Sequence, residues 1–166
     1  ASLVKFLNTG QACISPNRIF VQRGILDPFI KTFTDRVAKM KAGNGLEPDV
    51  SIGPLVNHAA VEKVSRQVED ALKKGATLHN GGQQLSGKNY SSGHFYAPTV
   101  LSNVSEDMLI YREETFGPVA AIIAFDTYDQ VINMANDTRY GLAAFISLGA
   151  KITSSRSSGL TRYHPA

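Results

Sequence analysis

The sequence contains a single cysteine, Cys13, among its 166 residues. One cysteine excludes an internal disulfide and any Cys-x-x-Cys zinc motif. No apolar run approaches the roughly 20 residues that a membrane-spanning helix requires. The first ten residues, ASLVKFLNTG, also lack the charged head, long apolar stretch and cleavage site of a secretory signal. We therefore expect a soluble chain without a membrane partner, located in the cytoplasm.

Basic charge is scattered along the chain rather than gathered in one stretch. The net charge is +3, and the longest basic run is Lys73-Lys74. A nucleic-acid surface needs a basic patch or stripe, so we expect no nucleic-acid partner. Metal binding is not indicated either, because the histidines lack the spacing of metal ligands and are expected at the surface or in turns. These histidines are His58, His79, His94 and His164.

Hydrophobic residues make up 43% of the sequence, which is enough to build a packed core. Short apolar runs predict strands at 18–22, 76–80, 95–101, 119–126 and 142–146. The run at 119–126 is nearly continuous, which is typical of a strand that is covered on both faces, and 142–146 is predicted as another central strand. Helical stretches alternate with these strands. The pattern predicts an α/β fold with a mostly parallel sheet and flanking helices.

Three amphipathic helices are predicted between the strands. The first opens at Asp27-Pro28 and ends at Gly43 and Gly45, and 47–54 follows as a loop. The second is capped by Asn57 and stopped by Gly75, and the third begins at Tyr128. Their expected inner faces are Phe29, Phe33, Val37 and Met40; then Val61, Val64, Val68, Ala71 and Leu72; then Val131, Ile132 and Ala135.

Cys13 has two interpretations. Free cysteines are among the most buried residue types, which favours a structural role in the core. Its neighbours Asn8, Gly10 and Gln11 favour a polar loop instead, where backbone N–H groups could stabilise a reactive thiolate. Residue types and spacing alone leave both interpretations open.

Four stretches in this order resemble the NAD(P)-dependent aldehyde dehydrogenases. FLNTGQAC (6–13) resembles the family's active-site cysteine signature, and EETFGPV (113–119) resembles its second signature. GNGLEPDVSIGPL (43–55) and ANDTRYGLAAFI (135–146) are similar to two further family stretches. The resemblance implies that residues 1–146 form part of an aldehyde dehydrogenase catalytic domain.

The resemblance also implies roles for individual residues. Cys13 matches the nucleophile, which attacks the aldehyde to form a thiohemiacetal and then a thioester that water hydrolyses to the acid. The backbone N–H of Cys13 matches one donor of the oxyanion hole. Glu114 matches the residue that binds the nicotinamide ribose, and Phe116 matches the aromatic residue beside it. Without the resemblance, Glu113 and Glu114 would be interpreted as a solvated pair at a turn.

The remainder of the family pattern is missing from this sequence. The dinucleotide-binding domain, the general base and the oxyanion asparagine are expected upstream, so NAD or NADP lacks its binding domain here. The glycines at 43–45 lack the strand and helix context of a phosphate-binding loop. Residues 147–166 form an atypical tail, as in a truncated product. We expect the isolated chain to be inactive, whereas a full-length parent would be a homo-oligomer.

The substrate implied by the resemblance is a small aldehyde. The succinate-semialdehyde dehydrogenases are the most similar group, and they usually carry an arginine immediately before the signature asparagine, where it pairs with the distal carboxylate. Leu7 occupies this position and cannot form a charge-assisted hydrogen bond. Ser15 replaces a second cysteine that some members carry, which excludes a local disulfide switch. The alternative function is a non-catalytic remnant that serves as a structural or interaction module.

Overall fold

The computed structural model describes residues 2–91 and 93–147. Its centre is a four-stranded sheet in the order β1-β6-β5-β4, in which β1 (Arg18–Gln22), β6 (Val119–Phe125) and β5 (Thr99–Ser102) are parallel. The edge strand β4 (Thr77–Asn80) pairs antiparallel with β5. The sheet is therefore mostly parallel, as the sequence predicts, although the reversed edge strand was not foreseen.

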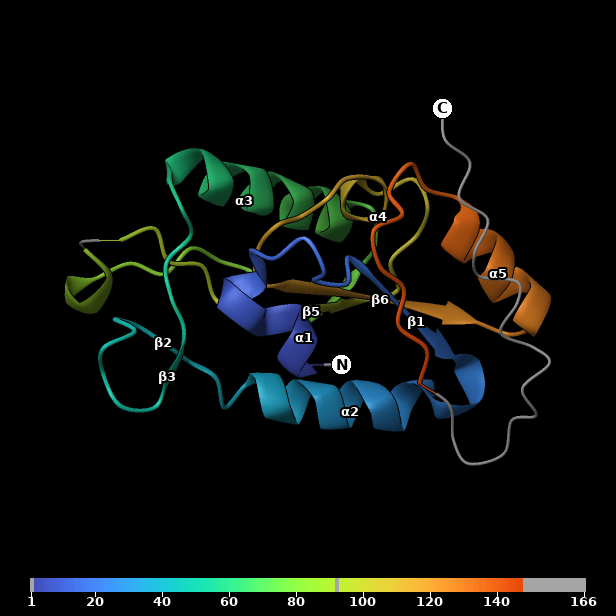
Figure 1. Cartoon of the computed structure of the whole chain (residues 1–166), viewed down its shortest axis with the longest axis horizontal. Coiled ribbons are helices and arrows are strands. Elements are labelled where there is room, and N and C mark those ends of the chain that lie inside the picture. The colour runs from blue at the N-terminus through green and yellow to red at the C-terminus, as the bar shows by residue number, and fades with distance from the viewer. Residues whose placement is uncertain (1, 92, 148–166) are drawn as a thin grey trace.

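Helices cover both faces of the sheet (Figure 1). The helix α2 (Leu26–Val37) lies on one face together with α1 (Ser2–Phe6), whereas α3 (His58–Lys73) and α4 (Leu109–Arg112) lie on the other. Side chains of β6 alternate between these layers, since Ala120 and Ile122 pack toward α2 while Ala121 and Ile123 pack toward α3. This arrangement confirms that the 119–126 run is a strand covered on both faces.

The α3 helix follows its sequence signals closely. The Asn57 side chain accepts a hydrogen bond from the backbone N–H of Ala60 at 2.9 Å, which confirms the predicted N-cap. The helix ends at Lys73, and Gly75 follows with a φ of +96°. Leu72 was expected on the inner face but is 37% exposed, because it lies at the margin of the buried stripe.

The α2 helix ends earlier than predicted. Its last residue is Val37, whereas Gly43 and Gly45 were expected to stop it. Residues beyond the helix instead enter a second small sheet, in which β2 (Lys41–Ala42) pairs with β3 (Val50–Ile52). The loop predicted at 47–54 thus contains a strand. Backbone pairing between these segments competes with helix continuation, while Met40 still packs against the α2 core cluster from outside the helix.

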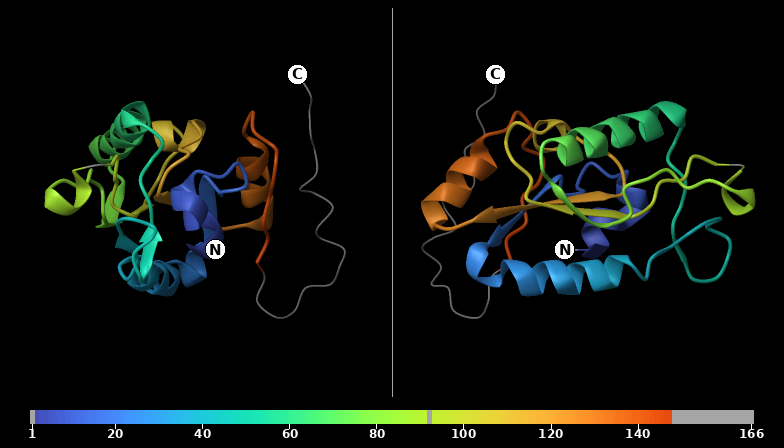
Figure 2. Two further views of the ribbon diagram at one scale, coloured as in Figure 1. Left: turned by 60° about the vertical axis from the view of Figure 1, so that its left-hand side comes forward. Right: turned by 180° about the vertical axis from the view of Figure 1, so that it is seen from behind.

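The prediction of a central strand at 142–146 is wrong. After α5 (Tyr128–Asn136), residues 137–147 run as exposed coil, seen in orange and red in Figure 2. Leu142 is 70% exposed and Phe145 is 59% exposed. The apolar run suits a buried strand, but no described strand pairs with it, so composition alone did not determine the structure. The α5 side chains expected inward, Val131, Ile132 and Ala135, are only half-buried.

Candidate active site

Cys13 lies in an exposed loop, which excludes the interpretation that it fills the core. We call residues 7–17 the Cys13 loop. It follows α1 and leads into β1, so it extends from the sheet at the amino end of an edge strand. The loop therefore presents the thiol to solvent from a rigid base.

Three consecutive residues of the Cys13 loop adopt left-handed backbone angles. The φ values are 47° at Asn8, 62° at Thr9 and 75° at Gly10. This region is unfavourable for a β-branched residue and persists only where surrounding contacts enforce it. The Thr9 hydroxyl supplies such contacts, because it accepts a hydrogen bond from the Gly53 N–H at 2.9 Å and donates to the Gly53 carbonyl at 3.2 Å.

Gln11 ties the same loop to the segment before α3. Its Oε1 accepts a hydrogen bond from the Val56 N–H at 2.9 Å, and its Nε2 donates to the Pro54 carbonyl at 3.2 Å. Within the loop, the Asn8 side-chain amide donates to the Gln11 carbonyl at 3.1 Å. The amides that made this stretch look like a polar loop are thus the groups that fix its shape.

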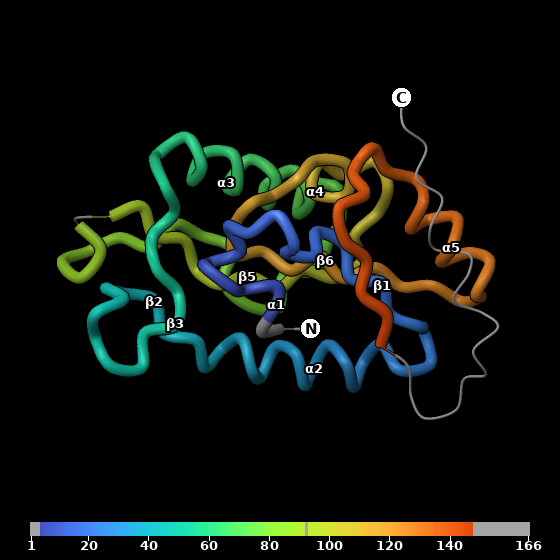
Figure 3. Tube along the Cα trace, in the orientation of Figure 1, coloured from blue at the N-terminus to red at the C-terminus, as the bar shows by residue number. Residues whose placement is uncertain are grey.

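A second loop, residues 113–118, packs directly against the Cys13 loop, as the trace in Figure 3 shows. We call it the Glu114 loop. A Cβ atom on Gly10 would lie only 2.1 Å from the Gly117 carbonyl oxygen, so the two backbones can meet only through glycine. The Thr115 N–H also donates to Asn17 Oδ1 at 3.2 Å. Two sequence signatures that are about a hundred residues apart therefore form one structural unit.

The adjacent carboxylates of the Glu114 loop have different surroundings. Glu113 accepts a hydrogen bond from Gln67 Nε2 at 3.2 Å and lies 3.5 Å from the Arg66 guanidinium, so α3 holds it. Glu114 forms no hydrogen bond or ion pair with any residue that the structure describes. It is half-buried, and its oxygens are free to accept hydrogen bonds from a ligand. The two neighbouring carboxylates are therefore not equivalent, since α3 holds Glu113 and does not hold Glu114.

Glu114 and Phe116 line one hollow of about 410 Å³. Its other lining residues come from the Cys13 loop, from the segment before α3 and from α3 itself: Gln11, Val56, Ala59, Ala60 and Lys63. Cys13 and Leu7 do not line it, although Leu7 is 54% exposed on the Cys13 loop. The hollow combines a carboxylate, an ammonium group, an aromatic ring and small apolar side chains. Sequence reasoning missed Lys63, which looked like one more charge on the polar face of a helix.

Lys5 is the unexpected charged residue near the site. It lies on α1 with 0% exposure, and its Nζ has no hydrogen-bond partner among the described residues. Burial lowers the pKa of this amine to about 8, while the negative charge of Glu114 acts in the opposite direction and raises it. Nothing in the sequence indicates this burial, because a lysine in a short amphipathic segment is normally exposed.

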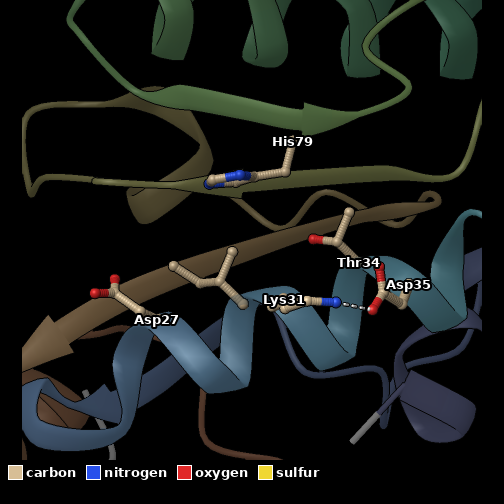
Figure 4. A pocket seen from close by; sticks show the side chains of 6 residues that line it. Asp27, Lys31, Thr34, Asp35 and His79 are labelled. Atoms are coloured by element: carbon tan, nitrogen blue, oxygen red, sulfur yellow. Dashed lines mark hydrogen bonds and ion pairs between the residues drawn. The ribbon is translucent and has the colours of Figure 1, made fainter.

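A second hollow, of about 310 Å³, lies between α2 and β4 (Figure 4). Its polar lining includes His79 and the ion pair between Lys31 and Asp35, whose Nζ and Oδ2 atoms are 2.7 Å apart. None of the residues predicted for the site lines it. In the described part of the chain, no three His, Cys, Asp or Glu side chains gather as metal ligands. No helix in that part is long and apolar enough to cross a membrane.

Comparison with known proteins gives a consistent result. The model of the aldehyde dehydrogenase family matches residues 2–153. The chain is 52% identical over 143 residues to the mitochondrial succinate-semialdehyde dehydrogenase of Oryza sativa subsp. japonica, covering 86% of this chain and 26% of the relative. It is 48% identical over 141 residues to a probable NADP(+) succinate-semialdehyde dehydrogenase of Sinorhizobium fredii, covering 85% and 28%.

Solved structures show the same fold. The crystal structure of succinate-semialdehyde dehydrogenase from Burkholderia pseudomallei superimposes with a TM-score of 0.79 at 40% identity. The match covers 84% of this chain and 28% of that one. The chain thus spans only between a quarter and a third of the length of the proteins that it resembles.

Proposed function

The chain belongs to the aldehyde dehydrogenase family, and we propose that it provides the nucleophile-bearing part of an enzyme that oxidises a small aldehyde, such as succinate semialdehyde, to the acid. One observation carries this proposal. The exposed thiol lies on the Cys13 loop, and Gly10 of that loop packs directly against Gly117 of the loop that bears the unpaired Glu114 carboxylate. Such precise support of an exposed thiol and a half-buried, unpaired carboxylate is characteristic of a site rather than of a surface turn.

In this proposal Cys13 performs the covalent chemistry. Its Sγ, as thiolate, forms a bond to the aldehyde carbon, and the carbonyl oxygen becomes the oxyanion of a thiohemiacetal. Loss of hydride from that carbon produces a thioester, and water then breaks the C–S bond to release the acid and the thiol. The Cys13 N–H is the proposed donor to the oxyanion, for which an exposed loop with a fixed backbone is suited.

The residues of the 410 Å³ hollow fit one end of a nicotinamide nucleotide. The unpaired Glu114 carboxylate can accept hydrogen bonds from sugar hydroxyls, the Lys63 ammonium suits a phosphate, and Phe116 presents a ring that is 37% exposed. NAD or NADP, when bound, supplies the hydride acceptor that this oxidation requires. The choice between the two cofactors stays open, since the named features are common to both.

The second candidate is a non-catalytic interaction module. The observation that favours it is apolar exposure around the site, where Leu7, Ile14 and Val56 are 54%, 43% and 76% exposed. Burial of these side chains in a protein contact would remove their apolar surface from water, which is favourable. In the enzyme proposal the same face would meet the rest of a longer polypeptide.

A chimera distinguishes the two candidates. Residues 2–146 would replace the matching segment of the rice relative, with Cys13→Ser as the matched inactive control. We expect aldehyde-dependent reduction of NAD or NADP by the chimera, and a fall in kcat/KM of at least about a thousandfold in the control, because serine without a base is a weak nucleophile. A folded chimera without activity would favour the module, and equal activity in the control would exclude Cys13 as nucleophile.

The same chimera tests the substrate through Leu7→Arg. A charged hydrogen bond contributes about 1.5–3 kcal/mol, or roughly ten- to a hundredfold in binding. We therefore expect kcat/KM for succinate semialdehyde, relative to an uncharged aldehyde of similar length, to rise by that factor. If the ratio is unchanged and already favours the charged substrate, residues outside this segment hold the carboxylate. A preference for the uncharged aldehyde in both variants would exclude succinate semialdehyde.

A further inference from the structure

We propose that Asn17 is a positioning residue, whose side chain keeps Glu114 and Phe116 directed at the 410 Å³ hollow by fixing the backbone between them. Its Oδ1 atom accepts a hydrogen bond from the Thr115 N–H at 3.2 Å. Thr115 separates the two lining residues in the sequence, so a bond to its backbone acts on both of them. The positioning follows from contacts within this chain, whereas its effect on cofactor binding rests on the proposed function.

The sheet explains why Asn17 reaches the Glu114 loop. Asn17 is the last residue of the Cys13 loop and directly precedes β1, while the Glu114 loop directly precedes β6. The two strands are parallel neighbours, with Arg18 opposite Ala121. The amino ends of neighbouring parallel strands lie at the same edge of a sheet, so the two loops enter the sheet side by side. Asn17 therefore bonds the neighbouring loop from the start of a paired strand.

Successive residues of the Glu114 loop alternate between two environments. Thr115 and Gly117 are buried, whereas Glu114 and Phe116 line the hollow. Thr115 is only 1% exposed. The Gly117 backbone lies directly against α3, because a Cβ atom there would be 2.6 Å from Val64 Cγ2. The two lining residues therefore project into the hollow only while the buried residues beside them keep their places.

The backbone at Phe116 needs support from its neighbours. Its φ is +50°, in the left-handed region that a bulky side chain seldom adopts. Such a conformation persists only where surrounding contacts enforce it. In the described part of the chain, the bond to Asn17 is the one hydrogen bond that the backbone of residues 114–116 forms. Loss of this acceptor should therefore let Phe116 relax to a negative φ and turn the adjoining residues away from the hollow.

The nuclear Overhauser effect between HN and Hα of Phe116 tests the positioning in the full 166-residue chain without any cofactor. A left-handed φ brings these two protons closer together than helical or extended angles do. We expect a strong effect in the wild type and in Asn17→Asp, which keeps the oxygen acceptor. A weaker effect is expected in Asn17→Leu, which keeps the size but not the acceptor, with Asn17→Ala in its place if that chain does not fold. Equal effects in the Asp and Leu variants, or a weak effect in the wild type, would overturn the proposal.

The chimera with the rice relative tests the effect on cofactor binding. Asn103→Ala is the matched control for Asn17→Ala, because the Asn103 amide also bonds a backbone group, the Gly75 carbonyl at 2.9 Å, beyond the carboxyl end of α3. The hollow lies at the amino end of that helix.

We expect KM for NAD or NADP to rise about fivefold or more in Asn17→Ala, with kcat changed less than about twofold, and neither to change in Asn103→Ala. An unchanged KM in Asn17→Ala, or an equal rise in both variants, would overturn the role of Asn17 in cofactor binding. An inactive chimera with the wild-type segment would contradict the proposed function instead, and the Phe116 measurement would still decide whether Asn17 positions the loop.

Discussion

The two paired loops around Cys13 and the coil at residues 137–147 are both irregular, yet they depart from ordinary burial in opposite ways. The helix α1, which leads into the Cys13 loop, buries a charge, since Lys5 has 0% exposure, whereas the coil exposes apolar side chains such as Leu142 and Ile146, at 70% and 52%. The loops are fixed by long-range hydrogen bonds from Thr9 and Gln11. In the described part of the coil, the first residue, Asp137, accepts hydrogen bonds from Arg112 at its carboxylate, at 2.6 Å, and from Arg18 at its carbonyl, at 3.2 Å.

The comparison shows which kind of sequence information determines a non-repetitive structure. Thr9 and Gln11 each have a hydrogen-bond geometry that only one backbone path satisfies, so a few polar side chains select that path. Apolar side chains are not directional, and they order a segment only where a surface is available to cover them. Directional hydrogen bonds from polar side chains therefore determine the shape of the loops. The apolar side chains of residues 142–146 do not by themselves specify a partner strand.

The largest effect is expected where the two loops meet. Gly10→Ala places a Cβ atom 2.1 Å from the Gly117 oxygen, at a φ of +75°. Overpacking and the left-handed penalty together should lower the free energy of unfolding by about 3–4 kcal/mol, measured by urea denaturation. Gly45→Ala is the control, because nothing lies within 4 Å of its Cβ position. A loss below about 1 kcal/mol in Gly10→Ala would mean that the loops are not in contact.

The residues around the contact between the two loops show how much of the site could be predicted from the sequence. Cys13, Glu114 and Phe116 stood out by resemblance, and the strand at 119–126 by its apolar run. The place of Lys63 in the hollow and the burial of Lys5 could not be found from the sequence, because both depend on how segments that are distant in the chain pack together. The antiparallel β4 and the early end of α2 were likewise missed, since pairing with distant segments decides both.

The next effect concerns the buried charge. The pKa of Lys5 falls from its ordinary 10.5 to about 8 in the folded chain. This difference in pKa corresponds to roughly 3 kcal/mol of free energy. The buried amine is still protonated at neutral pH, so it destabilises the folded state by that amount. Lys5→Met should therefore raise the free energy of unfolding at pH 7 by about 2–3 kcal/mol, in contrast to most core substitutions.

The pH dependence of this gain gives the sharper test. Between about pH 8 and pH 10.5 the unfolded chain binds a proton at Lys5 that the folded chain has released, so the stability of the wild type rises with pH across that window. The advantage of Lys5→Met should shrink over the same window and vanish above it. Urea denaturation of both chains at several pH values measures the difference. A difference in the free energy of unfolding that does not change with pH would mean that the Lys5 amine is exposed. The contrast between a buried charge and the exposed apolar coil would then not hold.

The smallest effect is expected in the coil, at Phe145→Ser. The Phe145 side chain is 59% exposed, and surface substitutions of this kind change the free energy of unfolding by no more than about 0.5 kcal/mol. Ile122→Ala, in a side chain with 0% exposure, is the comparison and should cost about 2–5 kcal/mol. Urea denaturation of both variants measures the ratio. If Phe145→Ser were to cost more than about 1 kcal/mol, residues 142–146 would be packed against the sheet in solution. The strand predicted from their apolar run would then form after all, most simply along the open edge of β1, which pairs with β6 alone among the described strands.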